Sequence, residues 1–123
     1  MGTWGSGNLD NDYALDELGD RSAKFIKTMM ARARKKASRE ADEWDHTTLF
    51  VEFEMVFALA ERKLFTTGYP ARAEVEALAQ KFIVGWDAYI DELGATDDYK
   101  ERRRATILET FERFAVLCDT FAT

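Results

Sequence analysis

The sequence predicts an all-α fold: a single-domain helical bundle of four long helices plus a short N-terminal helix, spanning residues 1–123. Three observations predict it. Apolar residues in the long segments recur at three- and four-residue spacing, which places them on one side of a helix. Glycine and the only proline stand between these segments, with Gly85 as the exception. A chain of 123 residues can also bury one hydrophobic core, but not two.

The chain opens with an irregular, glycine-rich strip at residues 1–9. A short helix should follow at about residues 10–18, because acidic residues occupy its first turn and Gly19 suits its C-terminal end. Asp20 can then cap a second helix, which we expect to continue to about Asp45. One side of that helix is apolar and its other sides are strongly basic.

The third helix is expected at about residues 46–65. Apolar residues lie nearly all round it, so we expect it to be the central helix of the bundle. Pro70 should lie near the first position of a fourth helix, and Gly94 should lie just past its end. Thr96 should cap a fifth helix that extends to about Phe121. The short links between these helices favour antiparallel neighbours.

The balance of charge and hydrophobicity limits the classes of function. There are 17 Lys and Arg against 23 Asp and Glu, so the net charge is −6 and the pI is about 4.8. Nucleic-acid phosphates attract basic surfaces, so binding by overall attraction is disfavoured and a basic protein partner is favoured. We expect no membrane partner and a cytoplasmic location, because no stretch approaches the roughly 20 apolar residues of a membrane span and no signal-peptide pattern opens the chain.

Motifs for metal binding or nucleophilic catalysis are sparse. Glu43 and His46 have Glu-x-x-His spacing, but a di-iron bundle needs that motif twice together with further carboxylates, and His46 is the only histidine. We therefore expect no metal, no cofactor and no catalytic residues. The single cysteine, Cys118, lies on an apolar helix side, where a buried thiol behaves as a small hydrophobe.

Three glutamates interrupt the apolar third helix: Glu52, Glu54 and Glu61. Desolvated carboxylates serve in general acid–base catalysis, so a carboxylate-based hydrolase is one alternative function. The preferred interpretation places these residues at the helix margin in ion pairs with arginines, because they occupy the only polar arcs of this helix.

Basic residues are concentrated in the second helix, with no acidic residue between the first and the last of them: Arg21, Lys24, Lys27, Arg32, Arg34, Lys35, Lys36 and Arg39. Such a face can contact a phosphate backbone, so a nucleic-acid-associated regulatory protein is the main alternative function. The helix lacks the interleaved aromatic residues on which single-stranded bases stack. A solvated face, or one that complements the acidic remainder of the bundle, is the preferred interpretation.

Three acidic residues late in the fourth helix are not explained by helix capping: Asp87, Asp91 and Glu92. Negative charge at this end opposes the helix dipole. Asp87 and Asp91 are also one turn apart, so they repel each other by about a few tenths of a kcal/mol unless a cation lies nearby. These three residues are the predicted partner-binding residues.

The N-terminal residues MGTWGSG, followed by Asn11, Asp12, Ala14 and Asp16, carry a resemblance. They resemble the start of a family of small bacterial proteins of unassigned activity, with the pattern M-G-x-W-G-x-G-x-x-x-N-D-x-A-x-D. One departure is Leu9, where that family more often has an aromatic residue. Some members occur near secreted-toxin systems, so the resemblance implies an immunity role.

The motif also has a physical interpretation. Trp4 can anchor the glycine-rich strip in a groove between helices, Asn11 or Asp12 can cap the first helix, and Asp16 can accept hydrogen bonds from the strip. The alternative is that Trp4 and the carboxylates line a ligand pocket.

These observations together favour a non-catalytic cytoplasmic binding protein. Its partner would be a basic protein such as a toxin domain, because an acidic protein competes electrostatically for a surface that holds phosphates.

Overall fold

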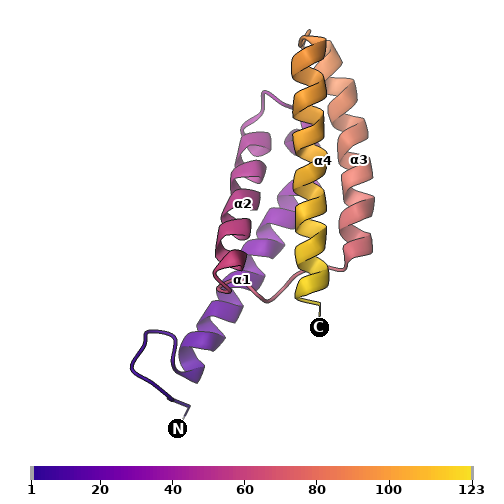
Figure 1. Cartoon of the computed structure of the whole chain (residues 1–123). Helices are drawn as coiled ribbons and strands as arrows, with labels where there is room; N and C mark the ends of the chain where they lie inside the picture. The colour runs from indigo at the N-terminus through magenta and orange to yellow at the C-terminus, as the bar shows by residue number, and fades with distance from the viewer. Residues whose placement is uncertain (1, 123) are drawn as a thin grey trace.

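The computed structural model describes residues 2–122, and these residues form helices joined by short links (Figure 1). The helices are α1 (Asp12–Ala33), the 3-10 helix η1 (Lys36–Arg39), α2 (Trp44–Glu61), α3 (Arg72–Glu92) and α4 (Asp97–Thr120). Within residues 2–122 the only extended pairing is one isolated antiparallel bridge between Thr3 and Asn11. The predicted all-α fold with four long helices is confirmed.

The predicted break at Gly19 is wrong, because α1 runs without interruption from Asp12 to Ala33. The expected short helix is the first part of α1, and Asp20 is an interior residue instead of a cap. Glycine within a helix costs about 1 kcal/mol relative to alanine, and α1 tolerates that cost. Gly19 faces the loop after α2: a methyl group there would lie 3.8 Å from the Thr67 hydroxyl.

The second expected helix also ends earlier than predicted, at Ala33 instead of about Asp45. The last carbonyl groups of a helix need partners from outside it. The buried Ser38 hydroxyl donates to the carbonyl oxygens of Ala33 and Lys35, at 3.1 and 2.7 Å. The chain therefore turns through η1 and reaches α2 in a new direction.

The predicted end of the fourth helix and the predicted start of the fifth agree with the structure. The Thr96 hydroxyl accepts a hydrogen bond from the Tyr99 backbone N–H at 3.3 Å and caps α4. Gly94 follows α3 with a φ of +70°, a conformation that strongly favours glycine. Pro70 lies slightly outside its predicted position, because α3 begins at Arg72.

Aromatic and aliphatic side chains from all four α-helices form the core. Its largest fully buried members are Trp86, Phe53, Phe82 and Phe114. The helices α3 and α4 form an antiparallel pair, α2 packs against α4, and α1 packs against α2 (Figure 1). Cys118 is buried here as predicted, and burial raises the pKa of its thiol to about 12.

The prediction that the third helix is the central helix, with its nearly all-round apolar surface covered, is wrong. One side of α2 is buried, but Val51 and Met55 on its other side are 54% and 46% exposed. The bundle has too few helices to cover an all-round apolar helix, so an apolar strip of α2 faces solvent. None of the helices in residues 2–122 combines the length and the hydrophobicity of a membrane span.

Candidate functional site

The first 20 described residues, 2–21, project beyond the rest of the molecule, and we call them the N-terminal arm (Figure 1). None of them is buried, and Ser22 is the first buried residue of α1. The arm has its own local order. The Asn11 side chain caps α1 by accepting from the Ala14 backbone N–H at 2.8 Å, as predicted. The Asp10 carboxylate accepts from the Gly7 backbone N–H at 2.9 Å.

The predicted role of Trp4 as a buried anchor is wrong, because the residue is 59% exposed. Its backbone holds the strip instead: the Trp4 N–H donates to the Asp10 carbonyl oxygen at 3.0 Å. Asp16 does not receive the hydrogen bonds predicted from the strip, since Asp10 takes that role. The indole ring is thus available to solvent, as are Tyr13 and Leu15, which are 88% and 47% exposed.

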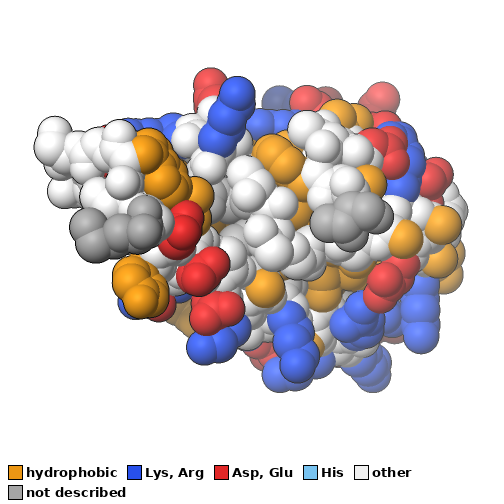
Figure 2. All heavy atoms as spheres, turned by 90° about the horizontal axis from the view of Figure 1, so that it is seen from below, with side chains coloured by type: hydrophobic (Ala, Val, Ile, Leu, Met, Phe, Trp, Pro, Cys, Tyr) orange, Lys and Arg blue, Asp and Glu red, His pale blue; other side chains and the backbone are white. Residues whose placement is uncertain are grey.

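The arm carries three exposed carboxylates at four-residue intervals: Asp12, Asp16 and Asp20. This spacing aligns them along one side of α1. Within residues 2–122, no lysine, arginine or histidine nitrogen lies within 4 Å of any of the three. Figure 2 views the molecule from the end that bears both termini and shows carboxylates beside hydrophobic side chains on the projecting part.

The predicted partner-binding residues of α3 have different surroundings. Asp87 accepts from Arg104 Nε at 3.1 Å, and Asp91 accepts from Lys100 Nζ at 2.6 Å. Both cations belong to α4, so the repulsion between the two carboxylates is compensated within the protein. Glu92 is exposed at the end of α3, beside a small hollow lined by η1.

Much of the basic charge of the second predicted helix is also compensated. Arg32 is paired with Asp45 at 2.7 Å and with Glu52 at 2.6 Å, and Arg34 is paired with Glu74 at 2.6 Å. The Arg39 stem packs against Gly85, where a methyl group would lie 2.7 Å from the Arg39 Cδ. This close approach explains the one glycine inside a predicted helix. Some of these basic side chains therefore form ion pairs or pack against α3, and they are not simply a solvated face.

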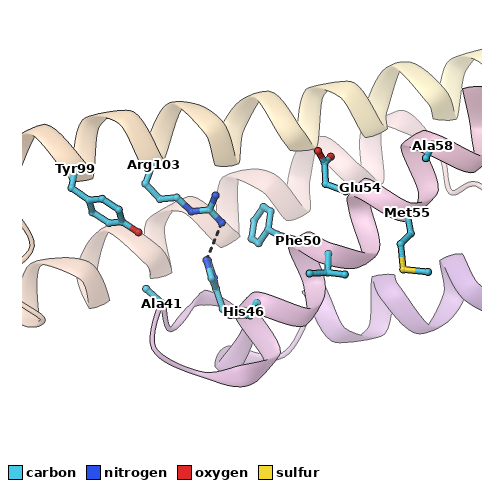
Figure 3. Close-up of a pocket in the computed structure, with 10 residues that line it drawn as sticks. Ala41, His46, Phe50, Glu54, Met55, Ala58, Tyr99 and Arg103 are labelled. Atoms are coloured by element: carbon cyan, nitrogen blue, oxygen red, sulfur yellow. Dashed lines mark hydrogen bonds between the residues drawn. The ribbon is translucent and has the colours of Figure 1, made fainter.

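A groove of about 730 Å³ lies between α2 and α4, and we call it the α2–α4 groove (Figure 3). Its principal walls are His46, Phe50, Val51 and Met55 of α2, with Tyr99 and Arg103 of α4. The exposed apolar strip of α2 is one wall of this groove.

The His46 ring lies at one end of the groove and is buried. Its Nδ1 lies 2.7 Å from the Ser38 carbonyl oxygen, and its Nε2 lies 3.2 Å from the Arg103 Nη2. A carbonyl only accepts and a guanidinium only donates, so Nδ1 carries the proton and Nε2 accepts. Burial lowers the pKa of His46 below its ordinary value, and the Arg103 charge lowers it further. The imidazole is consequently neutral at pH 7, and both nitrogens have partners.

Arg103 crosses from α4 over the Phe50 ring, with its guanidinium carbon 4.7 Å from the ring centroid. This is a cation–π contact. Burial lowers the Arg103 pKa, yet within residues 2–122 no carboxylate lies within 4 Å of it. The positive charge is balanced by no internal anion, so the groove can hold an external one.

Two of the three glutamates of the third predicted helix, Glu52 and Glu54, lie near arginines as expected, and for Glu61 no ion pair is found within residues 2–122. Glu52 is buried in its ion pair with Arg32, and exposed Glu54 lies 3.7 Å from Arg113 of α4. Glu61 is exposed at the end of α2. In the part of the chain that the structure describes, no three histidine, cysteine or carboxylate side chains are grouped as a metal site.

Sequence reasoning did not bring Arg103 or Tyr99 together with His46, because they are 57 and 53 residues away in the chain. The signal available was the excess of apolar residues around α2, which indicated either a fully surrounded helix or an uncovered apolar surface. Comparison with family models, curated proteins and solved structures finds no match to this chain.

Proposed function

We propose that this protein is a non-catalytic, cytoplasmic binding protein that captures a basic protein on its N-terminal arm. One observation carries the proposal: the arm presents Asp12, Asp16 and Asp20 in a line, with no cation from residues 2–122 within 4 Å. The family resemblance supports a toxin domain as the partner, with this protein as its immunity protein.

The energetics of α1 support this proposal. Like charges one turn apart destabilise a helix by about a few tenths of a kcal/mol per pair. Asp12 lies in the first turn, where the helix dipole favours it, but Asp16 and Asp20 lie beyond that turn. A basic partner would convert this repulsion into attraction.

The apolar residues of the arm also suit a protein interface. Leu15 precedes the buried Ser22 and Met29 at seven-residue intervals, so it lies on the same side of α1. That side is covered along the bundle and uncovered at Leu15. Tryptophan and tyrosine are enriched at the centres of protein interfaces, where they contribute much of the binding energy. The arm exposes one of each, Trp4 and Tyr13.

A basic toxin domain matches this surface. A nuclease holds phosphates with a positive surface, and an acidic arm competes for that surface. Complementary charge accelerates association at low ionic strength. The protein product of an adjacent gene is therefore the partner to test first.

The test is to replace Asp16 and Asp20 with lysine and to measure association with that product by stopped-flow kinetics at several salt concentrations. Association should become about tenfold slower at low salt and less dependent on salt, because the steering charges are reversed. The matched control replaces Glu101 and Glu109 of α4 with lysine, which changes the net charge equally at exposed positions outside the arm. Equal slowing in both variants, or no slowing in the arm variant, would show that the arm does not direct binding.

A further inference from the structure

The α2–α4 groove has features that binding of a basic protein to the arm does not use. Its volume of about 730 Å³ is within the usual range for small-molecule sites, about 300–1,000 Å³. It combines an uncompensated cation at one end with an apolar wall along its length. Figure 3 shows Arg103 reaching into this space from α4, above His46 and beside Phe50.

The end of the groove at Arg103 is suited to an anion. Arg103 gives one hydrogen bond, to the neutral His46, so most of its five N–H donors have no acceptor among the side chains of residues 2–122. Three other partly buried arginines, Arg32, Arg72 and Arg104, are paired with carboxylates. Arg39 also lacks a carboxylate within 4 Å among residues 2–122, but its stem packs against Gly85 outside the groove. A half-buried guanidinium favours a carboxylate partner, because charge-assisted hydrogen bonds are the strong ones.

The wall that leads away from Arg103 is mostly apolar. Val51, Met55 and Ala58 follow one another at four- and three-residue spacing on the exposed side of α2. From Val51 to Ala58 the helix rises about 10 Å, a length that a medium-chain alkyl group covers. The one acidic residue in the groove lining, Glu54, lies near Arg113 at 3.7 Å, so its charge is partly offset.

We propose that the α2–α4 groove binds a linear amphipathic carboxylate, with the carboxylate on Arg103 and the alkyl chain along Val51, Met55 and Ala58. The Phe50 ring lies against the Arg103 guanidinium, 4.7 Å from ring centroid to guanidinium carbon, and supports it at the head-group end of the groove. The site is separate from the N-terminal arm, so this inference does not depend on the proposed capture of a basic protein.

The experiment is a titration of the full chain with sodium octanoate, followed by amide chemical shifts and calorimetry. 1-Octanol tests the alkyl chain without charge, and octylamine tests it with the opposite charge. Octanoate should bind saturably, with shifts centred on the groove and an affinity about tenfold higher than that of octanol. Octylamine should bind more weakly than octanol, because Arg103 repels it.

Paired variants identify the source of the affinity. Arg103→Gln should weaken octanoate binding about tenfold and leave octanol binding unchanged, whereas Arg103→Lys should retain part of the preference for octanoate. Arg102→Gln is the matched control: it removes the same charge from an exposed position of α4 and should change neither affinity. Met55→Gln should weaken octanoate and octanol alike, and the corresponding arm variant Leu15→Gln should weaken neither.

Several outcomes would overturn the proposal. One is equal binding of all three probes, which would indicate unspecific apolar adsorption. Another is unchanged octanoate affinity in a folded Arg103→Gln protein. A third is a stable dimer in sedimentation analysis that Val51→Asp dissociates, because a second copy of the chain would then occupy the groove.

Discussion

The end of α3 and the start of α1 both carry aspartates one helical turn apart, but their surroundings differ. On α3, Asp87 and Asp91 meet Arg104 and Lys100 of the neighbouring α4. On α1, the aspartates at 12, 16 and 20 extend beyond the bundle, and no cation of residues 2–122 lies within 4 Å. The same local pattern is an internal ion-pair network in one place and an exposed acidic surface in the other.

This difference shows how a repulsive pattern in a sequence should be interpreted. Repulsion between two aspartates on one helix depends only on their local spacing. The cations that compensate it on α3 lie 17 residues (Asp87 to Arg104) and 9 residues (Asp91 to Lys100) along the chain, and only the packing of α4 on α3 brings them close. An acidic pair indicates a partner surface only where no neighbouring helix supplies the cation. The N-terminal arm satisfies that condition within the described residues.

The largest expected difference between bundle and arm concerns their tryptophans. Trp86→Ala should lower the free energy of unfolding by about 3–5 kcal/mol, because the ring is fully buried and its removal leaves a cavity. Trp4→Ala should change it by less than about 0.5 kcal/mol, as for other exposed positions. Urea denaturation of both variants checks this. A large loss for Trp4→Ala would mean that the arm folds back onto the bundle.

A second prediction separates the two regions by their response to pH. The folded-state pKa of His46 is lowered by burial, so below about pH 6.5 the unfolded chain takes up a proton that the folded protein resists. The contribution of His46 to the free energy of unfolding is therefore fully present above about pH 6.5. At lower pH the free energy of unfolding should fall by up to about 1.4 kcal/mol per pH unit. Urea unfolding between pH 7.5 and 5.5 measures this slope.

The matched variant is His46→Asn, whose side-chain amide can still donate to the Ser38 carbonyl while losing the titrating ring. The slope between pH 7.5 and 5.5 should nearly vanish in this protein. Asp16→Asn in the arm should leave the slope unchanged. An equally steep slope in His46→Asn would assign the pH response to other groups.

The smallest expected effects have opposite signs in the two acidic regions. Asp87→Asn should destabilise the protein by about 0.5 kcal/mol, because it removes the partner of Arg104 in a partly exposed ion pair. Asp16→Asn should stabilise it slightly, by about a few tenths of a kcal/mol, because it relieves repulsion from neighbouring aspartates. Thermal unfolding at low salt can resolve the two signs. If both substitutions changed the stability in the same direction, the two acidic regions would not differ in the way proposed.

Much of the fold was predictable because helical periodicity and capping are local properties. Thr96, Gly94 and Asn11 end or begin helices through contacts within a few residues of themselves. The two main errors in helix boundaries involve partners that propensity does not consider. Three residues after Gly19, the Ser22 hydroxyl is hydrogen-bonded to the backbone of Thr67, and where α1 ends the Ser38 hydroxyl donates to the Ala33 carbonyl oxygen. Local propensity cannot weigh such contacts.

The candidate sites were less predictable than the fold. The sequence singled out Trp4 and Asp16 of the arm, but it predicted a buried Trp4 and an Asp16 that accepts hydrogen bonds from the strip, and the structure shows neither. It also noted His46 without Arg103, since the two meet only when α4 lies beside α2. The exposure of the arm and the α2–α4 groove are consequences of packing that no local motif encodes.

The sequence by itself determined the helical class, several helix ends and the burial of Cys118, because spacing and capping act over one or two turns. Tertiary structure alone decided which charges are compensated and which apolar surfaces stay uncovered. Both depend on the number of helices available and on their directions: α4 supplies cations to α3, and no helix covers Val51 and Met55 of α2. Side chains distant in the chain interact only once packing has placed them within a few ångströms of each other.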